Sequence, residues 1–376
     1  MSPSDAPPHG VRLPDETRLA WLRLIRSENV GPATFRSLIN RYGGAEAALA
    51  ALPELAARGG RSVRVESLAA AEDEMNRASR MGARFICLGE PDYPPLLKAT
   101  ESAPPVLAVM GTETVLHQPA VAMVGARNAS LSGIKLTRQF ADEIGRAGYV
   151  VVSGLARGID AAAHEAALTT GTIGVFAGGL DRPYPDENRP LMRRIVDEGG
   201  CLLSERPFGW EPRSRDFPRR NRLVAGLALG LVVTEAALRS GSLISARIAA
   251  EIGRIVFAVP GSPLDPRAAG ANQLLKNGAI LATEANDVIA ALRPLDDRMG
   301  WMPPAIEEPP SGQETDEPAE GERERIIETL GPTPIDVDDI ILHTGARPGA
   351  VQLVLLELDL AGRLERHPGG LVSLLL

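Results

Sequence analysis

Residues 213–222, which read RSRDFPRRNR, combine five arginines with one Phe-Pro pair. The whole chain carries a formal net charge of −8, so this block is a clear departure from its background. Guanidinium groups bind phosphate oxygens through paired hydrogen bonds, and an aromatic ring can stack on a nucleic-acid base. The composition therefore fits a phosphate-binding surface, and a solvated arginine-rich loop would have the same composition.

Glycine, serine and arginine also follow short aliphatic runs that are typical of buried strands. The runs are 121–124, 149–152, 172–176, 201–203, 231–233 and 255–259. In open α/β sheets, ligands bind beyond the carboxyl ends of the strands, where glycine lets backbone amides approach an anion. We therefore predict an anion-binding rim at these ends, formed by Gly125, Arg127, Ser130, Ser153, Gly154, Gly178, Gly179, Ser240, Gly241 and Ser242. Arg127 alone would also suit an ordinary surface position at the start of a helix.

Composition excludes several classes of protein. None of the three lysines follows a glycine, so the chain has no Walker-A phosphate loop, and no strand end carries a GxGxxG dinucleotide fingerprint. No apolar run reaches the ~18 residues that span a bilayer, and the N-terminus does not read as a secretory signal. Cys87 and Cys201 lie in apolar stretches and are predicted to be buried free thiols. We expect a cytoplasmic protein without membrane contact, metal or cofactor.

The order of the elements predicts the fold class. Strand-like runs alternate with amphipathic helical segments from about residue 84 to 292, which specifies a Rossmann-like, doubly wound, mostly parallel sheet. Around it we predict a flexible tail at 1–14, a helical module at 15–80, the Rossmann-like domain at 81–293, an acidic proline-rich linker at 294–321 and a winged-helix-like module at 322–376.

The two terminal modules leave more than one interpretation open. Asn29-Val30-Gly31-Pro32 separates two helices, as in helix-hairpin-helix or SAM-like modules, where hairpin amides can hold a DNA phosphate. A small bundle used only for packing has the same pattern. The C-terminal module has nine acids against five arginines, which disfavours phosphate binding and indicates a protein contact. Asp160 and His164 lie four residues apart on one helix face, a spacing that suits an acid–base pair and, as the preferred interpretation, a structural hydrogen bond.

Taken together, the motifs resemble the DprA family, also called Smf. The similarity covers roughly residues 91–287 and is carried by SGLARGIDAAAH, FAGGLDRPYPDEN, FPRRNRLVAGLA, TEAALRSGSLISARIAAEIGR and VFAVPG. The resemblance implies a non-enzymatic protein that binds and protects incoming single-stranded DNA during natural transformation and loads the RecA recombinase onto it. It also implies a homodimer formed through residues 270–281, with Leu274, Leu275 and Ile280 as apolar candidates.

The resemblance assigns roles to individual residues as well. Gly125 and Arg127 would hold one phosphate, and Ser240, Gly241 and Ser242 would form the rim beside it. Phe217 would meet a base, surrounded by Arg219, Arg220 and Arg222, while Asn221 would position the loop. One departure concerns residues 184–188, where Asp186 and Glu187 stand near a position at which family members often have a DNA-binding lysine.

An enzymatic alternative is a phosphoribohydrolase with a Rossmann-like fold. Such enzymes carry a catalytic Glu at the end of a glycine-rich loop, and Ser245 occupies the corresponding position here. Glu205 and Glu235 remain as substitute carboxylates, with no partner base evident for either. A scaffold for protein partners is a third alternative, and it leaves the glycine-rich strand ends unexplained.

Overall fold

The computed structural model describes residues 11–299, 317–319 and 321–375, which form two compact units. The first unit covers the middle of the chain from Asp73, and the second combines Pro14–Glu72 with the C-terminal residues from 317 onward. Residues 1–10 of the predicted tail, and residues 300–316 and 320 of the predicted linker, lie outside the described part.

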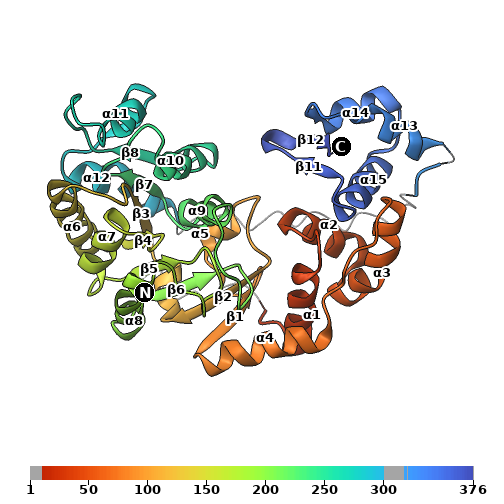
Figure 1. The fold of residues 1–376 in the computed structure, drawn as a ribbon, viewed down its shortest axis with the longest axis horizontal. Helices are drawn as coiled ribbons and strands as arrows, with labels where there is room; N and C mark the ends of the chain where they lie inside the picture. The colour runs from red at the N-terminus through yellow and green to blue at the C-terminus, as the bar shows by residue number, and fades with distance from the viewer. Residues whose placement is uncertain (1–10, 300–316, 320, 376) are drawn as a thin grey trace. The chain divides into compact units, whose positions relative to one another are not determined.

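A nine-stranded sheet forms the centre of the first unit (Figure 1). In spatial order its strands are β1 (Ala83–Cys87), β2 (Val106–Gly111), β6 (Cys201–Ser204), β5 (Thr172–Val175), β4 (Val150–Ser153), β3 (Ala120–Val124), β7 (Gly230–Val233), β8 (Ile255–Ala258) and β9 (Ile280–Leu281). Every pairing from β6 to β9 is parallel, whereas β1 and β2 pair antiparallel. The predicted mostly parallel sheet is confirmed, and β1, β2 and β9 are additional strands.

Successive side chains of the strands point alternately into two hydrophobic cores, one on each face of the sheet. Ala122 and Val124 of β3 face one core, and Val121 and Met123 face the other. The first core is covered by α9 (Asp216–Gly226), α10 (Gly241–Glu251) and α11 (Ala269–Lys276). The second is covered by α6 (Leu131–Arg146), α7 (Ile159–Ala167) and α12 (Ala285–Met299), while α8 (Arg189–Asp197) packs on β2, β5 and β6. Burial on both faces explains why the strands are continuously aliphatic.

The strand order fixes where a ligand can bind. From β3 the chain adds β4, β5 and β6 on one side, then crosses to add β7, β8 and β9 on the other side. The direction of winding reverses between β3 and β7, and such a switch point leaves a crevice beyond the carboxyl ends of the two strands. The segments that follow Val124 and Val233 therefore face one another across this crevice.

Helix α12 differs from the predicted linker boundary at residue 294. The helix continues through Pro294 to Met299, and Leu295 packs against the second core. Apolar burial of Leu295 offsets the backbone hydrogen bond that proline cannot donate.

The second unit joins the two ends of the chain. Its N-terminal helices are α1 (Asp15–Arg26), α2 (Pro32–Tyr42) and α3 (Ala45–Arg58), and α4 (Leu68–Arg80) crosses in sequence from this unit into the first. Its C-terminal part contains α13 (Glu322–Thr329), β10 (Ile335–Asp336), α14 (Val337–Thr344), α15 (Pro348–Leu360), β11 (Leu364–Arg366) and β12 (Leu371–Leu374). The order of helices followed by a hairpin confirms the predicted winged helix.

Helix α15 is the structural link within the second unit. Leu353, Leu356 and Leu360 share one apolar cluster with α1, α2 and α3. The hairpin before α2 also contacts the end of α15, because the Asn29 Nδ2 donates to the Leu360 carbonyl oxygen at 2.9 Å. Thr34 Oγ1 donates to the Asp359 carboxylate at 2.8 Å. In this structure the hairpin and α15 thus bury each other's surfaces.

Candidate functional site

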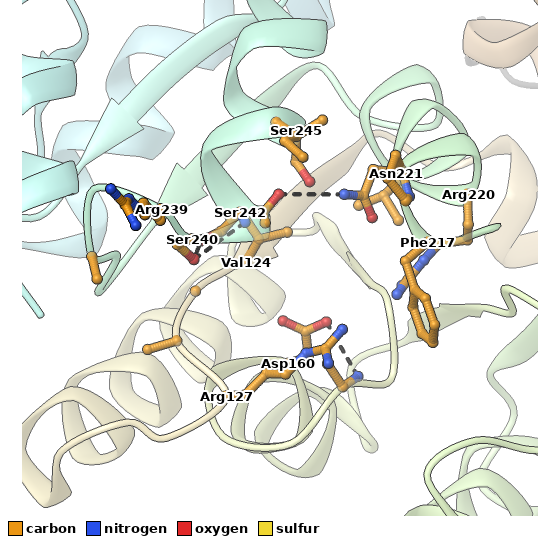
Figure 2. Close-up of a pocket in the computed structure, with 18 of the residues that line it drawn as sticks. Val124, Arg127, Asp160, Phe217, Arg220, Asn221, Arg239, Ser240, Ser242 and Ser245 are labelled. Carbon is orange, nitrogen blue, oxygen red and sulfur yellow. Dashed lines mark hydrogen bonds between the residues drawn. The ribbon is translucent and has the colours of Figure 1, made fainter. Parts of the chain in front are cut away.

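A cavity of about 750 Å³ lies at the switch point between β3 and β7 (Figure 2). Most of its lining comes from the segment after β3, the N-terminal half of α9 and the segment that leads into α10, and further residues come from α7 and from the loops after β5 and β8. The residues that matter below are Gly125, Arg127, Asp160, Tyr184, Phe217, Arg220, Asn221, Arg239, Ser240, Gly241, Ser242, Ser245 and Arg267. The predicted position of the site, at the carboxyl ends of the strands, agrees with this location.

The arginine block begins α9, and helical geometry separates its members. Phe217, Arg220 and Asn221 are three and four residues apart, so they share one face and line the cavity. Arg219 is exposed outside the cavity lining. Arg222 contacts Glu205 and the Ser102 carbonyl oxygen instead. Of the block's last three arginines, only Arg220 enters the cavity wall.

The start of α9 is fixed by Asp216. Its carboxylate accepts hydrogen bonds from the Trp210 indole at 3.0 Å and from the Arg213 backbone at 2.9 Å, and it pairs with Arg206. Burial by itself would raise the pKa of Asp216, but these donors outweigh burial and lower the pKa. Arg206 and Arg213 both lie over the Trp210 ring, at 5.1 and 5.2 Å from its centroid. These two arginines hold the loop together.

Arg220 is a buried cation beneath the cavity. Its residue is 6% exposed, its Nη1 donates to the Val175 carbonyl oxygen at 3.4 Å, and its Nε has no partner within the described chain. Burial lowers its pKa to about 10, with the charge of Asp160 opposing that shift. An arginine with this pKa is fully charged at neutral pH. A buried guanidinium with a free N–H is costly, and an incoming anion would satisfy it.

Asp160 connects Arg220 to the turn after β4. Its carboxylate accepts hydrogen bonds from the backbone N–H groups of Gly154 at 3.2 Å and Ala156 at 3.3 Å. Burial raises the pKa of Asp160, and the charge of Arg220 offsets only part of that effect. A Cβ atom on Gly154 would lie 1.3 Å from the Arg220 Nη1. Gly154 is therefore required to make room for the arginine, whereas the sequence suggested a direct approach to an anion.

His164 does not pair with Asp160, contrary to the predicted structural hydrogen bond. The Thr172 hydroxyl donates to the Val151 carbonyl oxygen, so it accepts from His164 Nδ1 at 2.7 Å. Burial, together with the charge of Arg220, lowers the pKa of His164 to about 3. His164 is therefore a neutral core residue near the buried charges.

This burial predicts a pH dependence of stability. The unfolded chain protonates His164 below its ordinary pKa of 6.5, while the folded chain resists protonation down to about 3. His164 stabilises the fold fully above pH 6.5, and that contribution is lost by about 1.4 kcal/mol per pH unit as the pH falls toward 3. Denaturant unfolding from pH 7 to 4 should show the wild type losing more stability than His164→Gln. Parallel losses in the two proteins would contradict the assignment.

Arg127, Phe217 and Tyr184 form one stack at the mouth of the cavity. The Arg127 guanidinium lies 5.2 Å from the centroid of the Phe217 ring, and the Tyr184 ring meets Phe217 edge-on at 5.5 Å between centroids. Arg127 is exposed and Tyr184 is 52% exposed. The stack thus offers a cation and two aromatic surfaces to a ligand from solvent.

The opposite wall is the N-terminus of α10. The Ser240 hydroxyl lies 2.5 Å from that of Ser242 and accepts from the Ser242 backbone N–H at 3.3 Å. Asn221 Nδ2 donates to the Gly241 carbonyl oxygen at 3.4 Å, so it links α9 to α10 (Figure 2). This agrees with a positioning role for Asn221. The start of α10 adds hydroxyls and a positive helix end to the cavity.

Several predicted rim residues lie outside the cavity. Ser130 caps α6 and donates to Glu235, and Ser153 is fully buried with its hydroxyl on the Met123 carbonyl oxygen. Gly178 and Gly179 pack against the carbonyl oxygens of residues 210 and 207. Because these groups are already engaged in the fold, we omit them, together with Arg219 and Arg222, from the proposed site.

Other cavity residues escaped the sequence prediction. Arg239 and Arg267 line the cavity beside Ser240, and Tyr184 and Asn128 line it beside Arg127. Arg239 directly precedes the predicted Ser-Gly-Ser segment, so its position in the chain was an available signal. Arg267 follows β8, and only the tertiary structure brings it to this wall.

The remaining candidates are placed as follows. Both carboxylates that could serve an enzyme are engaged, Glu205 with Arg222 and Glu235 with Ser130. Leu274 and Leu275 are partly buried on α11, and Ile280 is 41% exposed on β9 at the sheet edge.

Cys87 and Cys201 are buried free thiols, as predicted. Within the described ranges there is no metal-binding cluster of His, Cys, Asp or Glu, and no helix long and apolar enough to cross a membrane.

Family models match the sheet domain and both terminal modules. Residues 84–293 match the family model for DNA recombination-mediator protein A, residues 15–77 the DprA-like N-terminal HHH domain, and residues 307–370 the DprA winged helix domain. Protein Smf of Escherichia coli is 39% identical over 287 residues, which cover 75% of each chain.

Two solved structures share the fold. DNA processing protein A (DprA) from Streptococcus pneumoniae is 39% identical with a TM-score of 0.55, covering 60% of this chain and 77% of the other. DNA processing protein A from Helicobacter pylori, whose structure was described for its single-stranded DNA binding mode, is 30% identical with a TM-score of 0.51. That match covers 56% of this chain and 96% of the other. In sequence order the chain has a helical module, a nine-stranded Rossmann-like sheet domain and a winged helix, and it is a member of the DprA family of DNA recombination-mediator proteins.

Proposed function

We propose that this protein binds single-stranded DNA in the cavity between β3 and β7. The observation that carries the proposal is Arg220, a buried and charged residue that lines the cavity and whose Nε has no hydrogen-bond partner within the described chain. Arg127 supplies a second cation at the mouth. A phosphodiester would satisfy both, because charge-assisted hydrogen bonds to phosphate are among the strongest that arginine makes.

The aromatic residues favour a single strand over a duplex. Phe217 and Tyr184 line the same cavity as the two arginines. A base can stack on such rings only when it is unpaired and displaced from a helix. The relation to the Helicobacter pylori protein supports the same ligand.

We extend the proposal to the biological role that the resemblance implies. The protein would protect incoming DNA in the cytoplasm during natural transformation and load the RecA recombinase onto it, without catalysis. The family description as a recombination mediator supports this role. Exposed Ile280 on the edge strand β9, together with the partly buried Leu274 and Leu275 of α11, supports a homodimer through that edge.

Substitution of Arg127 and Phe217 tests the site. Arg127→Ala should weaken binding of a labelled oligothymidylate by about 10-fold, through loss of one charge-assisted contact. Phe217→Ala should weaken it by about 5- to 100-fold, through loss of base stacking. Arg247→Ala is the matched control, since Arg247 pairs with Glu251 on α10 and does not line the cavity.

Fluorescence anisotropy at several salt concentrations, with single strand and duplex, measures these effects. The wild type should bind the single strand more tightly and lose affinity steeply with salt. Equal affinity for the two forms would overturn the proposed function. If both site variants bind the single strand with wild-type affinity, the DNA-binding surface lies outside this cavity. Release of free base from nucleoside monophosphates would contradict a non-enzymatic role.

A further inference from the structure

A second cavity lies next to the first and shares its aromatic wall. It has a volume of about 330 Å³, within the usual range of small-molecule sites. Arg127, Tyr184, Phe217 and Arg220 line both cavities, so the stack of Arg127, Phe217 and Tyr184 stands between them. The smaller cavity adds Arg157 and Pro185 to that shared wall.

The floor of the smaller cavity is a fixed turn. Leu155 has a positive φ of 59°, which is unusual for a branched residue, and it is completely buried. Asn188 Nδ2 donates to the Leu155 carbonyl oxygen at 2.8 Å and to that of Ala156 at 3.3 Å. Together with the hydrogen bonds that Asp160 accepts, these contacts hold the turn that carries Arg157 in one conformation.

Arg157 lines the smaller cavity and does not line the larger one. Its guanidinium forms an ion pair with Glu187 at 2.6 Å, and the two side chains are 60% and 50% exposed. An ion pair this exposed contributes little to stability, because water and salt screen it. A phosphate that approaches the cavity can therefore displace Glu187 and bind Arg157 through two hydrogen bonds.

We propose that the smaller cavity is a second nucleotide subsite for the same DNA strand, in which Arg157 leaves Glu187 to bind a phosphate. The inference rests on the proposed function, because the shared stack would hold adjacent nucleotides on its two sides. Tyr184 and Pro185 provide an apolar surface for the second base, and the buried cation Arg220 lines both cavities. Glu187 competes with DNA for Arg157.

Because Glu187 and DNA compete for Arg157, substitutions of Glu187 and of Arg157 should change DNA affinity in opposite directions. Glu187→Gln removes the competing charge, so affinity for a ~12-nucleotide oligothymidylate should rise about 3-fold and depend more steeply on salt. Arg157→Gln should weaken the same complex by about 3- to 10-fold and make the salt dependence shallower. Both side chains are largely exposed, so neither change should affect folding.

Matched controls come from α8. Arg194 and Glu198 form a similar exposed ion pair at 3.0 Å, and neither lines either cavity. Arg194→Gln and Glu198→Gln should leave affinity and salt dependence unchanged. The inference is overturned if the Arg157 and Glu187 variants behave like these controls while Arg127→Ala still loses binding. If the wild type shows no preference for the single strand, the proposed function itself fails.

Discussion

Arg220→Met is expected to lower the free energy of unfolding by about 3–5 kcal/mol, the usual cost of removing the opposite charge that interacts with a buried carboxylate. Asp160 would then be left in the core without its cation, while it still accepts hydrogen bonds from the turn after β4. Methionine fills much of the volume of the arginine side chain, so packing loss is minor. Urea denaturation monitored by circular dichroism measures the change.

A double variant separates this structural cost from the role in binding. Arg220→Met combined with Asp160→Asn removes both buried charges, and the asparagine oxygen can still accept a backbone hydrogen bond, so most of the stability should return. Affinity for single-stranded DNA should nevertheless stay at least ~10-fold below wild type, because the phosphate partner is missing. Wild-type affinity in a stable double variant would remove Arg220 from the proposed site.

Leu360→Ala is expected to destabilise the second unit by about 2–5 kcal/mol, as for other fully buried leucines. Leu360 closes the cluster between α15 and the N-terminal helices, so the effect should reach both ends of the chain. Hydrogen exchange should accelerate in α2 and α3 as well as in α15. Leu342→Ala on α14 is the control, because Leu342 is 83% exposed and should change little. Faster exchange confined to α15 would show that the terminal modules fold independently.

The interface between α15 and the N-terminal helices also indicates which part of the chain contacts DNA. The sequence left open whether the hairpin at Asn29 holds a DNA phosphate. In the structure Asn29 donates to Leu360, and the acidic winged helix buries α15 against the N-terminal helices. We therefore assign the proposed DNA contact to the sheet unit. No local pattern could reveal this packing, because it joins residues more than 300 positions apart.

The core strands were predictable because their sequence signal is local. Strands β3 to β8 are short aliphatic runs flanked by glycine, and burial on both faces requires that composition. Strand β9 was missed since its two residues, Ile280 and Leu281, are exposed and its hydrogen bonds come only from β8. The proline-rich composition from Pro294 onward suggested a linker, whereas α12 continues past this proline because Leu295 packs against the second core.

Within residues 213–222, the sequence by itself determined the chemistry: cations beside one aromatic ring, following a strand of a parallel sheet. The tertiary structure decided which of them can act. A helical repeat of 3.6 residues directs Phe217, Arg220 and Asn221 to the cavity and turns Arg219 and Arg222 away. Asp160, from a distant helix, keeps Arg220 charged within the core. Composition sets which groups are available, whereas only the fold sets their direction, burial and partners.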